Sequence, residues 1–347
     1  MEIMAMAAPE QEKKHQQQHE ESDESIQKLV EKITGLATAI GKLPSLTPSP
    51  SVNALFTELV TTCIPPSRVD VDRHLSPEAQ QMRRRLILLC GDAEGHLEAH
   101  YSDLLAGHEN PLEHLPLFPY FNNYLELSKL EHGLLARHVS PSPSRVAFLG
   151  SGPLPLTSIV LASRHLTESS FVNYDVNGDA NGRARRLLRG DAALASRMEF
   201  VTADVNGVDG GEIASYDAVF LAALVGMTAA EKARVVERLG RHMAEGAALV
   251  VRSAHGARGF LYPVVDPEEI RRGGFDVLAV HHPEGEVINS VIIARKPPVT
   301  EADGGGEHAH GHGAVVSMAC QRCEMEARAH QKMEEMVAVE KLPAASS

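Results

Sequence analysis

The segment Arg145-Val-Ala-Phe-Leu-Gly-Ser-Gly-Pro-Leu-Pro155 decides the fold of this chain. Its first half is an apolar run typical of a buried strand, and the run ends in a turn that contains Gly150 and Gly152. Because glycine has no Cβ, such a turn lets the backbone approach a ligand closely. Nucleotides and nucleosides bind at glycine-rich turns of this kind in open α/β sheets. A purely structural turn is the alternative, so the segment predicts a strand and a candidate binding site.

Four more apolar runs follow, and helical stretches separate them. The runs cover residues 171–175, 198–205, 217–226 and 247–253, and the helical stretches cover 157–166, 178–190 and 228–245. Strands that alternate with helices predict a parallel sheet with helices on both faces. One run ends in Asp175 and another contains Asp204 near its end. An acid after the second strand is the usual acceptor for ribose hydroxyls in nucleoside-binding folds.

The last two apolar runs, 275–281 and 287–295, are joined by a linker around Pro283-Glu-Gly285. This linker is too short for a crossover helix, so the two runs should pair as an antiparallel hairpin. Five parallel strands closed by such a hairpin resemble the α/β, Rossmann-like fold of class I S-adenosylmethionine-dependent methyltransferases. The glycine turn departs from the common pattern of that fold, because no acid precedes it and Leu154 and Pro155 replace a third glycine. These departures bear on methyl transfer more than on the fold.

Composition and charge exclude several classes of function. Hydrophobic residues make up 43% of the 347 residues, enough for a substantial core. The net charge is −13, of which residues 1–25 carry −5 and residues 297–347 carry −4, so the middle is only mildly acidic. Without a basic face, we expect no nucleic-acid partner. No apolar run reaches the ~18 residues of a transmembrane helix, and Met1–Glu10 lacks the basic flank of a signal peptide.

The four cysteines form no disulfide framework, which is typical of a cytoplasmic protein; they are Cys63, Cys90, Cys320 and Cys323. Residues 1–25 are expected to be a disordered acidic tail, and residues 297–347 a disordered tail that contains histidines. The sequences His308-Ala-His-Gly-His312 and Cys320-Gln-Arg-Cys323 have metal-binding side chains. A single cysteine pair with flexible histidine neighbours is more often an adventitious binder, so we expect no metal site and no metal requirement.

The region 26–140 is predicted to be an N-terminal helical bundle, placed before the S-adenosylmethionine-binding domain at 141–296. Apolar residues recur at spacings of three and four from Ile26 to Leu43, which predicts a helix that Pro44 ends. Further helices are expected at 54–63, 77–106 and 122–138, so the region should form a four-helix bundle or nearly so. A bundle in this position can roof the ligand cleft.

Two features of this helical region suggest chemistry. Glu94 and Glu98 are four residues apart on the long helix, so they project from the same face. Tyr120 and Tyr124 have the same spacing at the start of the next helix. Each pair has a plain alternative, namely a solvated helix face for the glutamates and packing with a wet hydroxyl for the tyrosines.

From about Ile26 to Lys296 the chain resembles the nicotianamine synthase family. The motifs that carry the resemblance are Lys42-Leu-Pro-Ser-Leu46, Ala93-Glu-Gly-His-Leu-Glu-Ala-His-Tyr101, Phe148-Leu-Gly-Ser-Gly-Pro-Leu-Pro155, Phe220-Leu-Ala-Ala-Leu-Val-Gly226, Val251-Arg-Ser-Ala-His-Gly-Ala-Arg-Gly-Phe-Leu-Tyr-Pro263 and Glu286-Val-Ile-Asn-Ser290. The resemblance implies condensation of three S-adenosylmethionine molecules, which are substrates rather than a resident cofactor, into the metal chelator nicotianamine. Three methylthioadenosines are released. It also implies that one glutamate of the long helix and one tyrosine of the Phe-Pro-Tyr segment, which runs from Phe118 to Tyr124, form a catalytic pair.

This chemistry assigns the remaining candidates. A neutral α-amine must attack the Cγ of the aminobutyrate arm rather than the methyl group, so positioning is the main task. Burial would raise the pKa of Glu94 or Glu98 and fit it to accept the proton of the amine. The spacing does not choose between the pairs Glu94–Tyr120 and Glu98–Tyr124. For the donor we assign Gly150, Ser151 and Gly152 to the aminoacyl and ribose region, Asp175 to the ribose, and Asp204 with Val205 to the adenine; Leu221 to Leu224 should wall the cleft. Arg252, His255 and Arg258 are candidates for a substrate carboxylate, with a structural ion pair as the alternative for an arginine.

Three other functions remain open at this point. A small-molecule methyltransferase on the same fold would need an acceptor and would yield S-adenosylhomocysteine. A metal-binding protein would use the C-terminal tail, and a binding protein without catalytic activity would keep the fold alone. The oligomeric state is not readable from the sequence.

Overall fold

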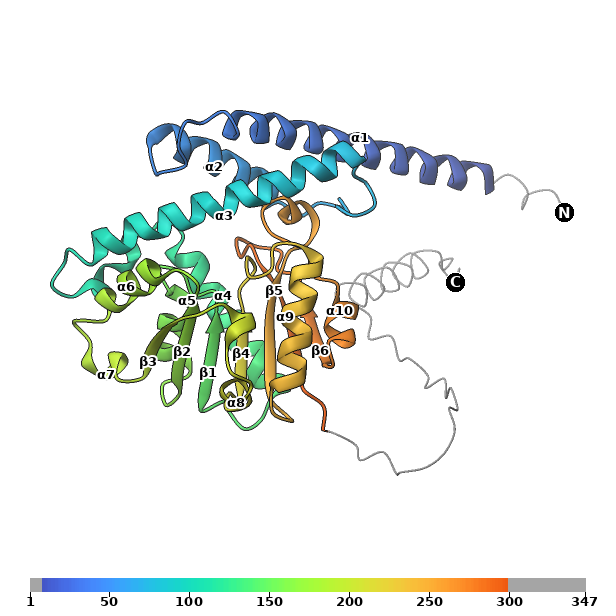
Figure 1. The fold of residues 1–347 in the computed structure, drawn as a ribbon. Helices are drawn as coiled ribbons and strands as arrows, with labels where there is room; N and C mark the ends of the chain where they lie inside the picture. The colour runs from blue at the N-terminus through green and yellow to red at the C-terminus, as the bar shows by residue number, and fades with distance from the viewer. Residues whose placement is uncertain (1–7, 299–347) are drawn as a thin grey trace, which may run out of the picture. The chain divides into compact units, whose positions relative to one another are not determined.

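The computed structural model describes residues 8–298, which belong to one compact unit. Its centre is a seven-stranded sheet in the order β3-β2-β1-β4-β5-β7-β6 (Figure 1). The strands are β1 (Arg145–Leu149), β2 (Ser170–Asp175), β3 (Met198–Thr202), β4 (Ala218–Leu221), β5 (Ala248–Ser253), β6 (Asp276–His281) and β7 (Ser290–Arg295). Neighbours from β3 to β5 pair in parallel, whereas β7 pairs antiparallel with both β5 and β6. The predicted parallel sheet and its closing hairpin are therefore confirmed.

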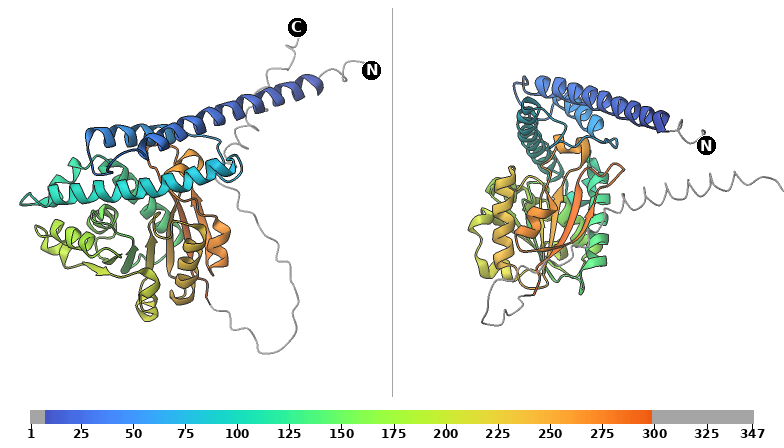
Figure 2. Two further views of the ribbon diagram at one scale, coloured as in Figure 1. Left: turned by 45° about the horizontal axis from the view of Figure 1, so that its top comes forward. Right: turned by 90° about the vertical axis from the view of Figure 1, so that its right-hand side faces the viewer.

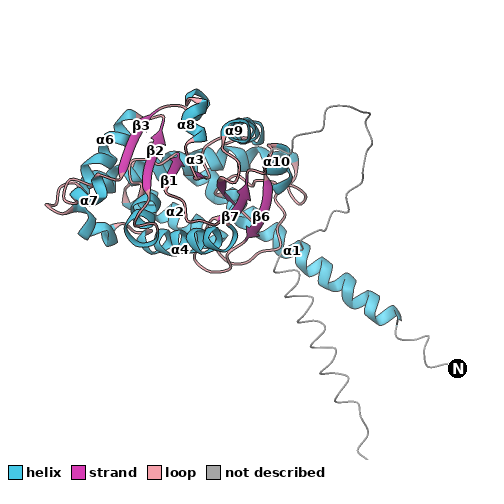
Figure 3. Ribbon diagram, turned by 90° about the horizontal axis from the view of Figure 1, so that it is seen from below, coloured by secondary structure: helices cyan, strands magenta, loops and turns pink. Residues whose placement is uncertain are grey.

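Helices cover both faces of the sheet, as the alternation of strands and helices predicts. One face carries α4 (Phe121–His138), α5 (Leu156–Val160), the π-helical turn η2 (Leu161–His165), α6 (Gly178–Leu187) and α7 (Ala192–Ala195). The other carries α8 (Gly210–Ala214), α9 (Ala229–His242) and α10 (Pro267–Arg272). Figure 3 shows α8, α9 and α10 on one side of the strands and α4 on the other. The short helices α7, α8 and α10 were not expected, because each is too short to show an apolar period.

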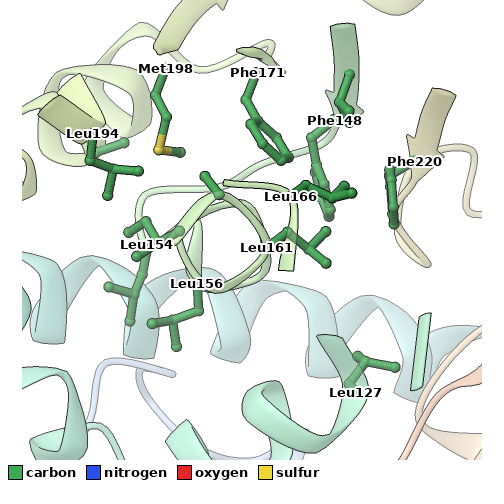
Figure 4. Close-up of a cluster of buried hydrophobic side chains, with 14 of the residues drawn as sticks. Leu127, Phe148, Leu154, Leu156, Leu161, Leu166, Phe171, Leu194, Met198 and Phe220 are labelled. Carbon is green, nitrogen blue, oxygen red and sulfur yellow. The ribbon is translucent and has the colours of Figure 1, made fainter. Parts of the chain in front are cut away.

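Each face of the sheet has its own apolar core, because neighbouring residues of a strand point to opposite faces. In β1, Phe148 belongs to the core under α4 and α5, whereas Leu149 belongs to the core under α9. Figure 4 shows part of the first core, where Phe148, Phe171 and Phe220 of three strands meet leucines of the covering helices. Near-continuous apolar strands are what a sheet buried on both faces requires.

The third layer lies across the carboxyl ends of the parallel strands. It consists of α1 (Ala8–Ile40), α2 (Pro50–Cys63) and α3 (Pro77–Leu105), which share an apolar core with η4 (Gly256–Phe260). Ser49 and Ser76 cap α2 and α3 by accepting hydrogen bonds from Val52 and Ala79. Both views of Figure 2 show this layer above one end of the sheet.

Two expectations about the helical region need correction. α4 does not complete a four-helix bundle, because Leu127, Leu134 and Leu135 bury its apolar face against the sheet. α1 begins at Ala8, so it includes most of the segment 1–25 that was expected to be disordered. Glu, Gln and Lys dominate that segment, and all three have high helix propensity.

Among the described residues, no helix combines the length and apolar character needed to cross a membrane. The same residues contain no group of three or more His, Cys, Asp or Glu side chains that could hold a metal ion. The expectations for the tail histidines and for Cys320 and Cys323 lie outside the described residues.

Candidate active site

A cavity of about 1040 Å³ lies between α3 and the carboxyl ends of the strands. Its roof is the middle of α3, from Leu88 to Ala99, and its floor is the turns that follow β1, β2, β3 and β4. Arg252 of β5, Tyr124 of α4, Tyr262 and Asn289 close one end. This is the position where α/β sheets bind ligands, at the carboxyl ends of the strands.

The glycine turn after β1 is shaped by close neighbours. Gly150 and Gly152 have φ values of +80° and +68°, a conformation that residues with a Cβ rarely adopt. A Cβ at position 150 would lie 2.4 Å from Cγ2 of Val225. A Cβ at position 152 would lie 2.6 Å from Oε2 of Glu98. The second glycine therefore lets the carboxylate of Glu98 approach the turn.

The acid that ends β2 and the acid that follows β3 are held by backbone N–H groups. Asp175 accepts hydrogen bonds from the N–H of Gly152 at 2.9 Å and of Asn177 at 2.8 Å. Asp204 caps the short turn η3 (Val205–Gly207) by accepting a hydrogen bond from the N–H of Asn206 at 2.8 Å. Both acids line the cavity, as expected from the sequence.

The other expected donor-binding residues also line the cavity, with one exception. The residues found there are Gly150, Ser151, Gly152, Val205 and Leu224. Leu221 does not line it, because its side chain lies in the core between β4 and α9. Strand alternation puts Leu221 on that face and gives Ala222 the place on the cavity wall.

The two glutamates of α3 meet around one tyrosine. The hydroxyl of Tyr124 lies 3.1 Å from Oε1 of Glu98 and 3.3 Å from Oε1 of Glu94. Tyr262, which follows η4, donates a hydrogen bond of 3.0 Å to the other oxygen of Glu94. Three elements that are distant in the sequence thus bring two carboxyl groups and two phenols to one point of the cavity.

Burial dominates the electrostatics of this cluster. The pKa of Glu98 is raised well above its ordinary value, first by burial and then by the charges of Glu94 and Asp175. Burial also raises the pKa of Glu94, although the hydrogen bonds from Tyr262 and Tyr124 oppose this. The pKa values of both tyrosines are raised, so both phenols stay protonated and donate. A carboxyl group with a raised pKa is suited to accept and release a proton near neutral pH.

The structure distinguishes between the two candidate tyrosines. Within the described residues, the Tyr120 hydroxyl makes no hydrogen bond to either glutamate, and its ring packs beside Phe118 at the edge of the core. Tyr120 does not line the cavity, whereas Tyr124 does. Tyr124 therefore meets both carboxylates, and the expected pair of Glu94 with Tyr120 is not formed.

Of the three candidates at and after the end of β5, only Arg252 lines the cavity. Its Nε and Nη2 donate to the two carboxylate oxygens of the buried Glu131 at 2.7 and 3.0 Å, and Nη2 also donates to Thr157. Arg252 is thus a structural ion pair, the alternative that the sequence left open. His255 is exposed and stacks on His282, away from the cavity.

Arg258 is also wrong as a candidate for a substrate carboxylate. It is buried, and its guanidinium donates to the carbonyls of Ile64, Pro283 and Gly285, which ties α2 to the loop between β6 and β7. The sequence places Arg258 after β5 but does not show that η4 turns it away from the sheet.

Sequence reasoning did not single out Tyr262 or Asn289. Both lie in segments quoted for the resemblance, Val251–Pro263 and Glu286–Ser290, so a signal was present. Neither segment shows from its own pattern which side chain faces a cavity, because both residues lie outside the strands.

Comparisons with known proteins identify the family. Residues 21–301 match the family described as "Nicotianamine synthase protein". Nicotianamine synthase 3 of Oryza sativa subsp. indica is 74% identical over 325 residues, which cover 92% of this chain and 94% of that protein. Nicotianamine synthase 9 of Hordeum vulgare is 69% identical, with 91% of this chain and 95% of that protein covered.

Solved structures show the same fold. MtNAS in complex with MTA and tNA has a TM-score of 0.64 and 23% identity, and the match covers 78% of this chain and 97% of that one. A Glu-to-Gln mutant of MtNAS in complex with S-adenosylmethionine matches with the same TM-score and 24% identity, over 78% of this chain and 98% of that one. With the family match over most of its length, the chain belongs to the nicotianamine synthase family.

Proposed function

We propose that this cavity joins S-adenosylmethionine units through their aminobutyrate arms, with Glu98 as the base, to make nicotianamine. The observation that carries the proposal is the position of the Glu98 carboxylate. It lies over the glycine turn and shares the Tyr124 hydroxyl with Glu94. Membership of the nicotianamine synthase family supports the overall reaction, in which three donors yield one nicotianamine and three methylthioadenosines.

The donor occupies the end of the cavity nearest β1, β2 and β3. Asp175 accepts hydrogen bonds from the ribose hydroxyls, as acids after the second strand do in related folds. Asp204 and Val205 lie beside the adenine, and Leu224 covers it from the loop after β4. This placement brings the methionine arm past Gly152 towards Glu98. S-adenosylmethionine as the ligand of the MtNAS structure supports the same choice of donor.

The site selects the reacting carbon by position. Every carbon on the sulfonium is electrophilic, so the carbon in line with the amine determines the product. The α-amine of the acceptor attacks Cγ of the donor, the new C–N bond forms, and the Cγ–S bond breaks. The electron pair of that bond stays on sulfur, which leaves as the neutral thioether methylthioadenosine. The proton that the amine loses passes to Glu98.

Glu94 and the two tyrosines prepare this step. Tyr262 donates to Glu94, and Tyr124 shares its hydroxyl between Glu94 and Glu98; both contacts favour the charged form of Glu94, which holds the acceptor ammonium beside Glu98. Glu98 receives fewer hydrogen bonds and has the more strongly raised pKa, so it is the better match for the proton of an amine. The two acids therefore divide the work of binding the acceptor and accepting its proton.

Product analysis with S-adenosylmethionine as the only reagent tests the proposal. Mass spectrometry should detect nicotianamine and methylthioadenosine in a ratio of one to three. A methyltransferase would give no product without an acceptor and would release S-adenosylhomocysteine once an acceptor was added. Either of those results would contradict the proposal.

We also propose that the protein is cytoplasmic. The described cysteines support it, because Cys63 and Cys90 are both free thiols.

A further inference from the structure

Three polar side chains in the cavity wall contain an atom that the described part of the chain leaves without a hydrogen-bond partner. They are Ser151, Ser158 and Asn289, which are 6%, 1% and 7% exposed. Buried polar atoms in folded proteins are almost always hydrogen-bonded, so such a set needs a partner that the chain does not supply. Because all three residues line the cavity, a bound molecule is the natural partner.

Asn289 is the most informative of the three. The unpartnered atom is its amide nitrogen. An amide nitrogen can only donate, so the missing partner is an acceptor. Ser158 adds a hydroxyl that can also donate a hydrogen bond. Ser151 belongs to the glycine turn, so its partner should be the S-adenosylmethionine that donates the aminobutyrate arm.

The fold places Asn289 and Ser158 on either side of Arg252. Asn289 precedes Ser290, which pairs with Ser253 across β5 and β7, so Asn289 lies at the carboxyl end of β5. Arg252 reaches the other way and donates to Thr157, the neighbour of Ser158. The bonds of Arg252 to Glu131 and Thr157 use Nε and Nη2, and within the described residues no hydrogen bond of Nη1 is formed. This end of the cavity is therefore rich in donors.

The end of the cavity that is rich in hydrogen-bond donors, around Arg252 and Asn289, lies away from the proposed nucleoside position. In the order β3-β2-β1-β4-β5-β7-β6, Asp175 ends β2 and Asp204 follows β3, whereas Arg252 belongs to β5 and Asn289 directly precedes β7. An amino acid bound at the second end would meet carboxyl groups at Glu94 and Glu98 and hydrogen-bond donors at Asn289. This arrangement fits an ammonium at one side and a carboxylate at the other.

We propose that Asn289, with Ser158 and Arg252 beside it, binds the α-carboxylate of the acceptor amino acid. The inference rests on the proposed function, because it assigns the second substrate of the same reaction. Asn289 and Ser158 thereby fix the direction in which the acceptor enters the cavity. Its amine then faces Glu98 and the Cγ of the donor.

Steady-state release of methylthioadenosine from S-adenosylmethionine tests this, together with the affinity for methylthioadenosine itself. For Asn289→Ala we expect KM to rise about ten- to hundredfold, the loss typical of one hydrogen bond to a charged group. Asn289→Asp should raise KM further, because it sets a carboxylate against a carboxylate. Ser158→Ala should have a smaller effect in the same direction. The affinity for methylthioadenosine, which lacks the amino-acid arm, should stay within about twofold in all three.

Asn123→Ala is the matched control. Asn123 donates to the carbonyl of Glu286 at 2.6 Å, so it holds the same segment from outside the cavity. It should leave KM unchanged, and thermal melting identifies any variant that fails to fold.

Each other outcome overturns the inference. An Asn289→Asp protein with the wild-type KM would show that only the shape of the side chain matters. A KM for Asn289→Asp below that of Asn289→Ala would indicate that an ammonium group binds at this end. Equal losses in Asn123→Ala would reduce Asn289 to a loop support. If Asn289→Ala does not fold, an unchanged KM in Ser158→Ala rejects the site. If the wild-type protein releases no methylthioadenosine at all, the proposed function fails instead.

Discussion

The two ends of the cavity hold their acids in different ways. At the end proposed for the nucleoside, Asp175 and Asp204 accept hydrogen bonds from backbone N–H groups of turns. At the end proposed for the transfer reaction, beneath α3, Glu94 and Glu98 accept only from tyrosine hydroxyls among the described residues. Backbone donors fix a charged acid in one place, whereas a phenol shared by two acids permits a proton to move. The first end is suited to binding and the second to chemistry.

Removal of the base should have the largest effect. For Glu98→Gln we expect kcat to fall about 10²- to 10⁴-fold, the usual contribution of a general base. The shape of the side chain is kept, so the affinity for methylthioadenosine should not change. The release of methylthioadenosine in single-turnover experiments measures the rate, and calorimetry measures the affinity for methylthioadenosine. A variant with wild-type turnover would remove Glu98 from the mechanism.

The nucleoside end should respond in the opposite way. Asp175→Ala should weaken the binding of methylthioadenosine about ten- to hundredfold, because hydrogen bonds to a charged acceptor are lost. Asp276→Ala, which removes an exposed acid on the edge strand β6, is the control and should bind normally. Calorimetric titration distinguishes them. Equal affinities for the two variants would show that Asp175 does not contact the nucleoside.

The boundary between the two ends is Gly152. Gly152→Ala puts a Cβ 2.6 Å from Oε2 of Glu98 and strains a residue with φ of +68°, so the carboxylate must move. We expect kcat to fall about tenfold or more, since small displacements of a catalytic group are costly. Gly182→Ala meets nothing within 4 Å and should keep full activity. If both variants turned over equally, the close approach of Glu98 to the turn would not matter.

The tyrosines should affect the pKa values of the glutamates as well as their positions. Tyr262→Phe removes a hydrogen bond that favours charged Glu94, so the pKa of Glu94 should rise further. The pH at which kcat/KM begins to increase should therefore move upward. Tyr120→Phe removes a hydroxyl that bonds to neither glutamate and should leave the pH profile in place. If the pH profile shifted only in Tyr120→Phe, Tyr120 rather than Tyr124 would be the tyrosine that acts on the glutamates.

The smallest expected effect is on stability. Folding raises the pKa of Glu98, so the native state binds more protons than the unfolded state and loses stability as the pH rises through the native pKa. Glu98→Gln removes this loss and should melt about 1–2 °C higher than wild type at pH ~8, the shift for a change of about 1 kcal/mol in a unit of this size. The gain should shrink near pH ~4.5, where the native carboxyl is protonated. A variant that melts lower at high pH would argue against the raised pKa.

The sequence predicts the fold more completely than the site, and particular residues show why. The hairpin of β6 and β7 followed from a linker too short for a helix, and Gly152, Asp175 and Glu98 followed from local motifs. Tyr262 and Asn289 come from loops, where no period indicates the direction of a side chain. Arg258 was misplaced for the same reason. Leu221 was misplaced because a buried strand is apolar on both faces, so its composition does not reveal which side faces the cavity.

The configuration at Cγ tests the central claim most directly. In the proposed complex, the Glu98 carboxylate beside the donor arm could act either as the base or as a nucleophile that forms an ester. S-adenosylmethionine with a single stereospecific deuterium at Cγ distinguishes the two, because each in-line displacement inverts that carbon. The account predicts inversion in the nicotianamine produced, from one direct attack by the amine. Retention would require two displacements and would contradict the role of Glu98 as a base.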